Sequence, residues 1–267
     1  MNPGKRAFLL NFSLLLAPLL GLSPARAQTA PSTVSLIMGE ALDESGRSKP
    51  LRPLQRKLFD YLENELNVNF DVKRYPWPRA ERKAMNGDGL IFGLPKNPER
   101  ERSLRFSDPT HSNTLWLVTR SDATFRFESI KDLHGKKIGA VRGYGYGDEF
   151  ERARTAGIIR FEDDLPSRVT RLQRLLLKRV DVVLFYQPSW QTAAEFEAEL
   201  RAQAAPLAAD LRLPPDVTIS VLPKPVQTDT PQYFAVARGG RDEVLIDRIN
   251  QALLKQQKQA SLRNRRG

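Results

Sequence analysis

The stretch that decides the fold is DLHGKKIGAVRGYGYG, residues 132–147. Within it, an apolar strand-like run at 136–143 leads into GYGYG (143–147), the stretch of the chain that is densest in glycine. Asp148 and Glu149 then begin a helix, and glycines at this point let backbone N–H groups approach a ligand. The spacing is not that of a nucleotide-binding loop. The segment predicts either a tight turn between a strand and a helix or a pocket wall formed by its two tyrosines.

The same alternation of short apolar strands and amphipathic helices continues in both directions from this stretch. Leucines spaced by three or four residues between Leu51 and Leu66 mark one face of a helix, and residues 70–75 alternate with the period of a half-buried strand. Alternating strands and helices predict an α/β fold with largely parallel sheets. We expect strands at 34–39, 70–75, 89–95, 114–120, 136–143, 180–186, 217–223 and 232–238, helices at 51–66, 78–87, 148 onward, 169–176, 187–203 and 244–254, and loops at 98–109 and 206–215.

The N-terminal segment has the three parts of a secretory signal peptide. Lys5 and Arg6 precede an apolar run at 7–22, and Ala25-Arg26-Ala27 places small residues at a cleavage site. The apolar run is shorter than the roughly 20 residues that span a membrane. We therefore expect residues 1–27 to be a signal peptide, and the mature chain to be a soluble protein of the periplasm.

Composition narrows the function classes. The 267 residues are 40% apolar and 27% charged, as in globular proteins, and the formal charge is +11. We expect the excess charge, including Arg168 and Arg171 of one helix, to lie on solvated helix faces, and we expect no nucleic-acid partner. The chain has no cysteine, and His111 and His134 make a poor zinc site, so we expect no metal site and no cofactor.

No arrangement of residues predicts catalysis. Ser107 and Ser112 lack the surroundings of a nucleophile, and His111 could act as a base but has no partner in the sequence. Trp77 stands between two prolines in YPWPRA (75–80), where it could line a cleft or pack in the core. The chain is interpreted as a binding protein and not as an enzyme.

Four motifs occur in the order found in one family. They are PERERSLRFSDP (98–109), DLHGKKIGAVRGYGYG (132–147), KRVDVVL (178–184) and NQALLKQQKQ (250–259). The chain thereby resembles the family 3 periplasmic solute-binding proteins of amino-acid ABC transporters. The resemblance implies a type II fold of two lobes, each a mostly parallel sheet flanked by helices. It places lobe one at 28–119 plus 227–267 and lobe two at 120–226, with crossings near Thr119–Ser121 and Pro225–Thr230.

The resemblance also implies a binding site. The family's arginine that clamps a ligand carboxylate falls on Arg100, and a guanidinium suits that role through two parallel charge-assisted bonds. Where amino-acid binders hold the ligand's ammonium with an acidic residue, this chain has Tyr186. The ligand is therefore expected to be a standard α-amino acid or, with at least equal weight, an anionic or aromatic small molecule. The site residues expected are Arg100 and Arg142 as anchors, Trp77, Tyr144, Tyr146 and Tyr186 as walls, and Gly93 and Gly143 in the adjoining loops.

The function implied is capture of a small, carboxylate-bearing ligand between the lobes of a monomer, for delivery to an ABC permease. Two alternatives remain open at this point. The same module could present its ligand to a signalling partner, or it could be an enzyme with Glu40 or His111 as its acid or base.

Overall fold

The structure is a computed structural model that describes residues 30–43, 45–164, 167–240 and 242–264. The expected signal peptide lies outside the described residues. From Pro31 onward the chain forms one compact unit, which contains two groups of strands, called here the first and the second lobe. Among the described helices, none combines the length and the apolar character that crossing a membrane requires.

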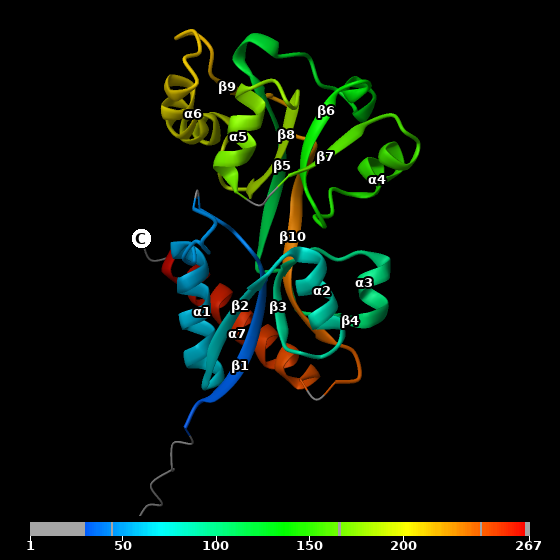
Figure 1. Cartoon of the computed structure of the whole chain (residues 1–267). Coiled ribbons are helices and arrows are strands. Elements are labelled where there is room, and N and C mark those ends of the chain that lie inside the picture. The colour runs from blue at the N-terminus through cyan, green and yellow to red at the C-terminus, as the bar shows by residue number, and fades with distance from the viewer. Residues whose placement is uncertain (1–29, 44, 165–166, 241, 265–267) are drawn as a thin grey trace, which may run out of the picture. The chain divides into compact units, whose positions relative to one another are not determined.

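The first lobe holds the N-terminal strands and the C-terminal helix. Its elements are β1 (Ser32–Gly39), α1 (Pro53–Leu66), β2 (Val68–Tyr75), α2 (Trp77–Met85), β3 (Leu90–Leu94), α3 (Pro98–Ser103), β4 (Leu104–Phe106) and α7 (Glu243–Asn264). The second lobe holds η1 (Ser121–Ala123), η2 (Ile130–Leu133), β6 (Lys137–Val141), α4 (Asp148–Thr155), β7 (Arg160–Asp164), α5 (Arg168–Leu176), β8 (Val182–Pro188), α6 (Ala193–Asp210) and β9 (Ile219–Val221). Two long strands, β5 (His111–Arg120) and β10 (Gln227–Ala237), run between the lobes (Figure 1).

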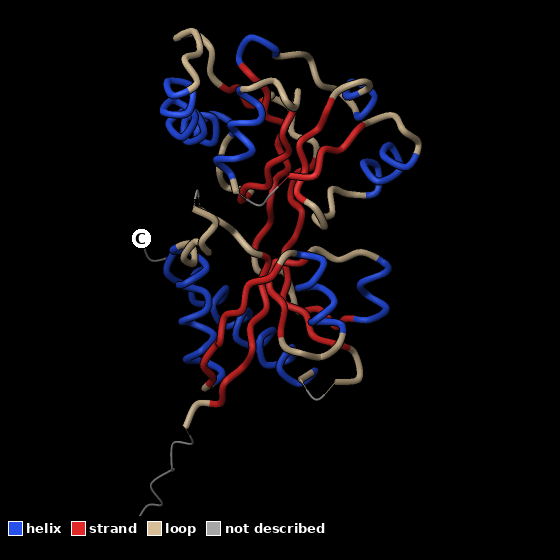
Figure 2. Tube along the Cα trace, viewed as in Figure 1, coloured by secondary structure: helices blue, strands red, loops and turns tan. Residues whose placement is uncertain are grey.

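The strand order is β2-β1-β3-β10-β5-β8-β6-β7, with β4 on β10 and β9 on β5. In the first lobe β1 is parallel to β2 and β3, and in the second β6 is parallel to β7 and β8. The connecting strands run the other way, β10 against β3 and β5 against β8. Helices cover both sides of the strands in each lobe (Figure 2). The predicted α/β fold class is confirmed.

Strand pairing changes partner within β10. Residues 227–232 of this strand pair with β5, and residues 233–237 pair with β3 and β4. On β5, pairing with β8 covers residues 113–118. In these pairings the neighbouring strand changes near residue 113 on β5 and near residue 233 on β10. The lobe limits and crossings expected from the sequence stay a prediction.

Each lobe has a core on both faces of its strands, because neighbouring strand residues point to opposite faces. In β1, Leu36 and Met38 pack with α1 and α7, whereas Ile37 packs with Ala80 and Ala84 of α2. The second lobe repeats this division on β8 and β5. There Val182, Leu184, Leu115 and Leu117 pack toward α4, and Val183, Phe185, Trp116 and Val118 pack toward α5 and α6.

Two loop predictions were wrong. The charged stretch after β3 contains a helix, α3, in which the Asn97 side chain accepts a hydrogen bond from the Arg100 backbone N–H at 2.7 Å and Pro98 takes the first turn. Helix α6 continues through Pro206 to Asp210. Pro206 is exposed while Leu207 packs on the core, so burial of the following turn offsets the hydrogen bond that proline removes.

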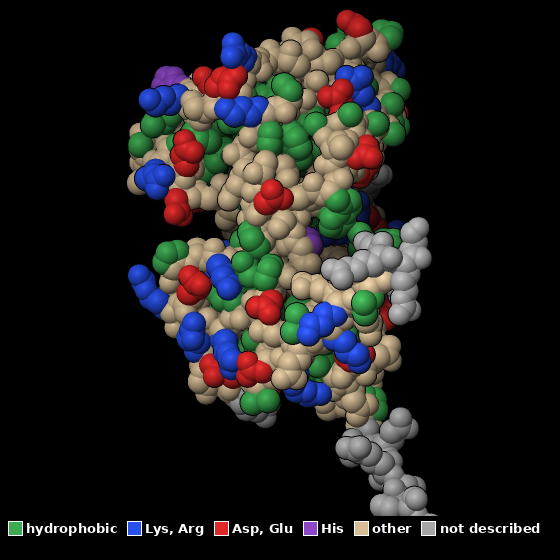
Figure 3. Space-filling view, turned by 180° about the vertical axis from the view of Figure 1, so that it is seen from behind, with side chains coloured by type: hydrophobic (Ala, Val, Ile, Leu, Met, Phe, Trp, Pro, Cys, Tyr) green, Lys and Arg blue, Asp and Glu red, His purple; other side chains and the backbone are tan. Residues whose placement is uncertain are grey.

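Charged side chains of both signs are distributed over the surface. On the face in Figure 3, Lys and Arg side chains are interspersed with Asp and Glu side chains over both lobes. Ion pairs such as Lys255–Glu65, with 2.7 Å between Nζ and Oε2, are exposed and contribute little to stability.

Candidate functional site

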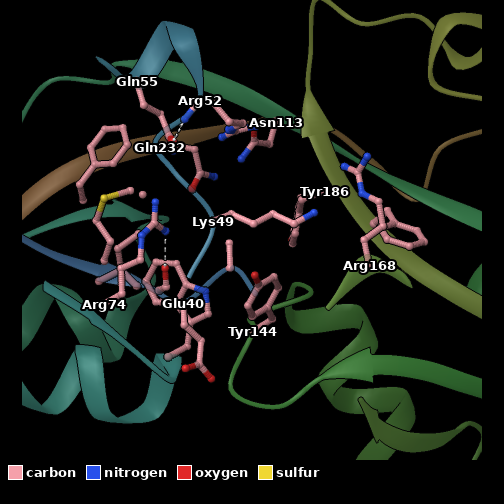
Figure 4. A pocket seen from close by; sticks show the side chains of 18 of the residues that line it. Glu40, Lys49, Arg52, Gln55, Arg74, Asn113, Tyr144, Arg168, Tyr186 and Gln232 are labelled. Atoms are coloured by element: carbon pink, nitrogen blue, oxygen red, sulfur yellow. Dashed lines mark hydrogen bonds between the residues drawn. The ribbon is translucent and has the colours of Figure 1, made fainter. Parts of the chain in front are cut away.

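A cavity of about 450 Å³ lies where the two lobes meet. The first lobe contributes the chain after β1, the start of α2 and the end of β3. The second lobe contributes the glycine-rich loop 143–145 and residues of α5, β8 and α6. The volume is in the range of sites for small ligands. Figure 4 shows side chains from both lobes around this space.

Most of the expected site residues line this cavity. They are Trp77, Gly93, Arg100, Gly143, Tyr144 and Tyr186. The other two do not line it: Arg142 is exposed, and Tyr146 is buried behind the wall. That these residues contact a ligand stays a prediction.

The tyrosines of the wall form a packed unit. The Tyr146 hydroxyl accepts a hydrogen bond from the Val141 backbone N–H at 2.7 Å, and its ring stacks parallel to Tyr186 with 6.0 Å between centroids. Tyr186 donates to the Gly145 carbonyl at 2.8 Å. Burial raises the pKa of both phenols, so both stay protonated and neutral at pH 7. Tyr146 therefore positions Tyr186, and Tyr186 shapes the glycine-rich loop.

Contact between the lobes depends on Trp77 and the glycine-rich loop. Trp77 is half-buried, lines the cavity, and meets Tyr144 edge to face with 5.9 Å between ring centroids. A Cβ on Gly39 would lie 2.2 Å from the Trp77 ring, and a Cβ on Gly143 would lie 2.5 Å from the ring of Pro78. Gly143 also has a φ of +79°, which glycine adopts most easily. Trp77 lines the cavity and also packs against the core of the first lobe, so each of its two interpretations holds in part.

Arg100 has a partner that the sequence did not reveal. Its side chain is 8% exposed, and its Nε and Nη2 donate to the two carboxylate oxygens of Glu81 at 2.8 and 3.0 Å. Its Nη1 donates to the Pro95 carbonyl at 3.1 Å. Glu81 lies on α2, 19 residues away, and no local pattern links it to Arg100. The guanidinium is thus already engaged in a bidentate pair at the edge of the cavity.

The remaining cations of the cavity were not predicted as site residues. They are Lys49, Arg52, Arg74, Arg168 and Arg171, and the lining carboxylates are Glu40 and Glu199. The expectation of a solvated face was wrong for two of them. Arg171 is buried, donates to the Leu184 carbonyl at 3.0 Å and lies 4.0 Å over the Phe185 ring, while half-buried Arg168 pairs with Glu199.

Three cations of the first lobe have no carboxylate partner within ion-pair distance among the described residues. They are Lys49, at the end of the loop after β1, Arg52, at the start of α1, and Arg74, at the end of β2. The Arg74 Nη1 donates to the Gly39 carbonyl at 3.2 Å. Loss of hydration lowers the pKa of both guanidinium groups, and repulsion by Arg168 lowers that of Arg52 further. Both remain cations, because arginine titrates far above neutral pH.

Neutral polar groups complete the lining. His111 Nδ1 lies 2.9 Å from Thr110 Oγ1, and burial, with a contribution from Arg52, lowers the pKa of His111 to about 4. The imidazole is therefore neutral at pH 7. Asn113 Oδ1 is buried without a hydrogen-bond partner among the described residues, so it is an acceptor available to a ligand. In the same described part of the chain, no group of three His, Cys, Asp or Glu side chains could hold a metal ion.

No protein-family model matches the chain, and no curated protein sequence matches it. Solved structures do match. An ancestral arginine-binding protein bound to arginine is 19% identical with a TM-score of 0.63, over 86% of this chain and 94% of its own. The chain has the fold of two-lobe periplasmic binding proteins.

Two further structures share this fold. An amino-acid ABC transporter substrate-binding protein from Streptococcus pneumoniae, bound to L-arginine, is 16% identical with a TM-score of 0.61, over 87% of this chain and 92% of its own. An ancestral amino-acid-binding protein described as a precursor of cyclohexadienyl dehydratase is 18% identical with a TM-score of 0.58, over 85% of this chain and 90% of its own. This likeness is consistent with the family resemblance of the sequence motifs.

Proposed function

We propose that the mature chain is a divergent family 3 solute-binding protein of the periplasm, which captures a small, carboxylate-bearing ligand between its lobes for uptake by an ABC permease. The observation that carries the proposal is the cavity at the meeting of the lobes, lined from both sides by aromatic and cationic groups. The fold supports it, because matching structures with this fold are amino-acid-binding proteins.

Capture in such a cleft works by closure. The lobes are connected by β5 and β10, and a change of backbone angles where these strands change partners would open or close the cavity. Trp77 and Tyr144 approach each other from opposite lobes, so a ligand that contacts both would stabilise the closed arrangement. We infer that Trp77, Tyr144 and Tyr186 contact the ligand.

The proposal is tested by thermal unfolding of residues 28–267 against amino acids, organic acids and aromatic acids. A ligand at about 100 times its dissociation constant adds roughly 2.7 kcal/mol to the native state, which for this size raises the midpoint by about 5–10 °C. Trp77→Ala should abolish the shift, because it removes one wall of the cavity. Trp190→Ala is the matched control, since Trp190 is 60% exposed and does not line the cavity. If no compound shifts the midpoint, the proposal fails.

An enzyme on the same scaffold is the second candidate, and one observation favours it. Glu40 and neutral His111, the two acid-base candidates from the sequence, both line the cavity. In the test, the wild-type protein is incubated with each compound that shifts the unfolding midpoint, and NMR of the solution then detects any product. A product that disappears with Glu40→Gln or His111→Gln would establish an enzyme, and recovery of the unchanged compound would exclude this reaction for it.

A further inference from the structure

Two of the arginines that line the cavity already pair with carboxylates of the protein. These pairs contribute little net positive charge to the binding of an anionic ligand. Arg100 is balanced by Glu81 through two hydrogen bonds, and Arg168 is balanced by Glu199. Nε and Nη2 bind Glu81 and Nη1 binds the Pro95 carbonyl, so three of the five N–H donors of Arg100 are in use and its charge is already balanced before a ligand arrives. The unbalanced positive charge that would attract an anion therefore comes from other cations of the cavity.

Lys49, Arg52 and Arg74 have the required charge and position. Lys49 and Arg52 lie in the connection that leads into α1, and Arg74 lies near the end of β2. Figure 4 shows the three around the same space, with Arg168 on the side of the second lobe. None of the three has an ion pair with a carboxylate in the described part of the chain. Lys49 and Arg52 are exposed at the mouth of the cavity and Arg74 is half-buried, and Arg74 and Arg168 both repel the charge of Arg52. An anion between these cations would offset that repulsion.

The sign and size of the excess charge in the cavity limit the net charge that a ligand can have. Setting aside the two balanced pairs, these three cations face one lining carboxylate, Glu40, while His111 is neutral. The excess is about two positive charges, without counting Arg171. A ligand with two negative charges would balance it. An amino acid with no net charge would not, and a cationic ligand such as the arginine of the matching structures would increase the repulsion.

We propose that this cavity binds a small oxyanion with at least two negative charges, held by Lys49, Arg52 and Arg74 and not by Arg100. The inference rests on the proposed binding function and names its ligand class. Guanidinium groups bind carboxylates and phosphates equally well through their paired donors, so both a dicarboxylate and a phosphate monoester fit the site. The anion also offsets the repulsion between Arg52 and Arg168 across the lobes, which couples binding to closure.

The test is isothermal titration of residues 28–267 with four probes of similar size: succinate, glycerol 3-phosphate, L-glutamine and L-arginine. We expect a dianion to bind and neither amino acid to do so at 1 mM. Arg52→Gln and Arg74→Gln should each weaken dianion binding at least tenfold. Arg126→Gln removes the same charge from a side chain that is 87% exposed and outside the cavity, and should change the affinity less than twofold. Succinate alone indicates a dicarboxylate, and glycerol 3-phosphate alone a phosphate ester.

The outcomes separate this inference from the function on which it rests. If L-glutamine or L-arginine binds and the dianions do not, the binding function stands and the dianion site is overturned. If a dianion binds with equal affinity to wild type, Arg52→Gln and Arg74→Gln, the assignment of these arginines is overturned. Binding of none of the four probes overturns the dianion site, while the binding function is decided separately by the thermal-unfolding panel. Unfolding midpoints without ligand, measured for each variant, ensure that a lost affinity does not reflect a lost fold.

Discussion

Replacing Arg100 by glutamine should destabilise the protein even without ligand. The substitution removes two charge-assisted hydrogen bonds to Glu81 and one to the Pro95 carbonyl, and it leaves the Glu81 carboxylate 20% exposed without its cation. Removing one partner of a buried pair costs about 3–5 kcal/mol. Because Glu81 keeps some contact with water, we expect about 3 kcal/mol, or a midpoint lowered by roughly 6–12 °C.

The assay is urea unfolding of residues 28–267 in a double-mutant cycle of Arg100→Gln and Glu81→Gln. The two single costs should exceed the cost of the double variant by about 2 kcal/mol, since the double variant leaves no unpaired charge. Arg105→Gln is the control, because Arg105 pairs with Asp247 at 2.6 Å on the surface and should contribute less than about 1 kcal/mol. If Arg100→Gln leaves the free energy of unfolding unchanged but abolishes ligand binding, the ligand-clamp prediction is right and the structural role is refuted.

Three further substitutions test other parts of the structure. Burial lowers the pKa of His111 from 6.5 to about 4, so the unfolded chain binds more protons than the folded protein between these pH values. The free energy of unfolding should therefore rise by about 2–3 kcal/mol between pH 4 and 6.5 and level off above. His111→Gln should remove this rise, and equal pH profiles of wild type and variant would contradict the prediction. Gly143→Ala should weaken ligand binding at least tenfold, because the added Cβ would collide with Pro78 of the other lobe. Gly135→Ala is the control, since Gly135 has a similar φ but nothing within 4 Å, and it should cost about 1 kcal/mol of stability and no affinity. Equal losses of affinity in the two variants would refute the close approach of Gly143 and Pro78. Phe59→Ala should cost about 3–5 kcal/mol in urea unfolding, because Phe59 is 1% exposed among Phe70, Phe92 and Phe234, and a cost under 1 kcal/mol would contradict this packing.

Periodicity in the sequence was enough to predict most strands and helices and the α/β class. Apolar residues with period two or about 3.6 have to be buried by some neighbouring layer, so strands such as β1 and helices such as α1 could be found before their neighbours were known. Local rules failed where they competed with packing. Pro206 indicated a break, but burial of the following turn kept α6 helical, and the charges of 99–102 hid the N-terminal signal of Asn97 and Pro98 in α3.

The sequence by itself determined the alternation of elements, and the resemblance of its motifs placed Arg100 and Tyr144 beside the cleft. Only the tertiary structure decided which charges remain for a ligand. Glu81 reaches Arg100 from another helix, and Arg168 and Arg171 turn into the cavity instead of toward water. The connection before α1 and the end of β2 bring Lys49, Arg52 and Arg74 to the same cavity. The reason is physical: periodicity records which side of an element is buried, whereas the partner of a charge depends on which elements meet, and that depends on the packing of the whole chain.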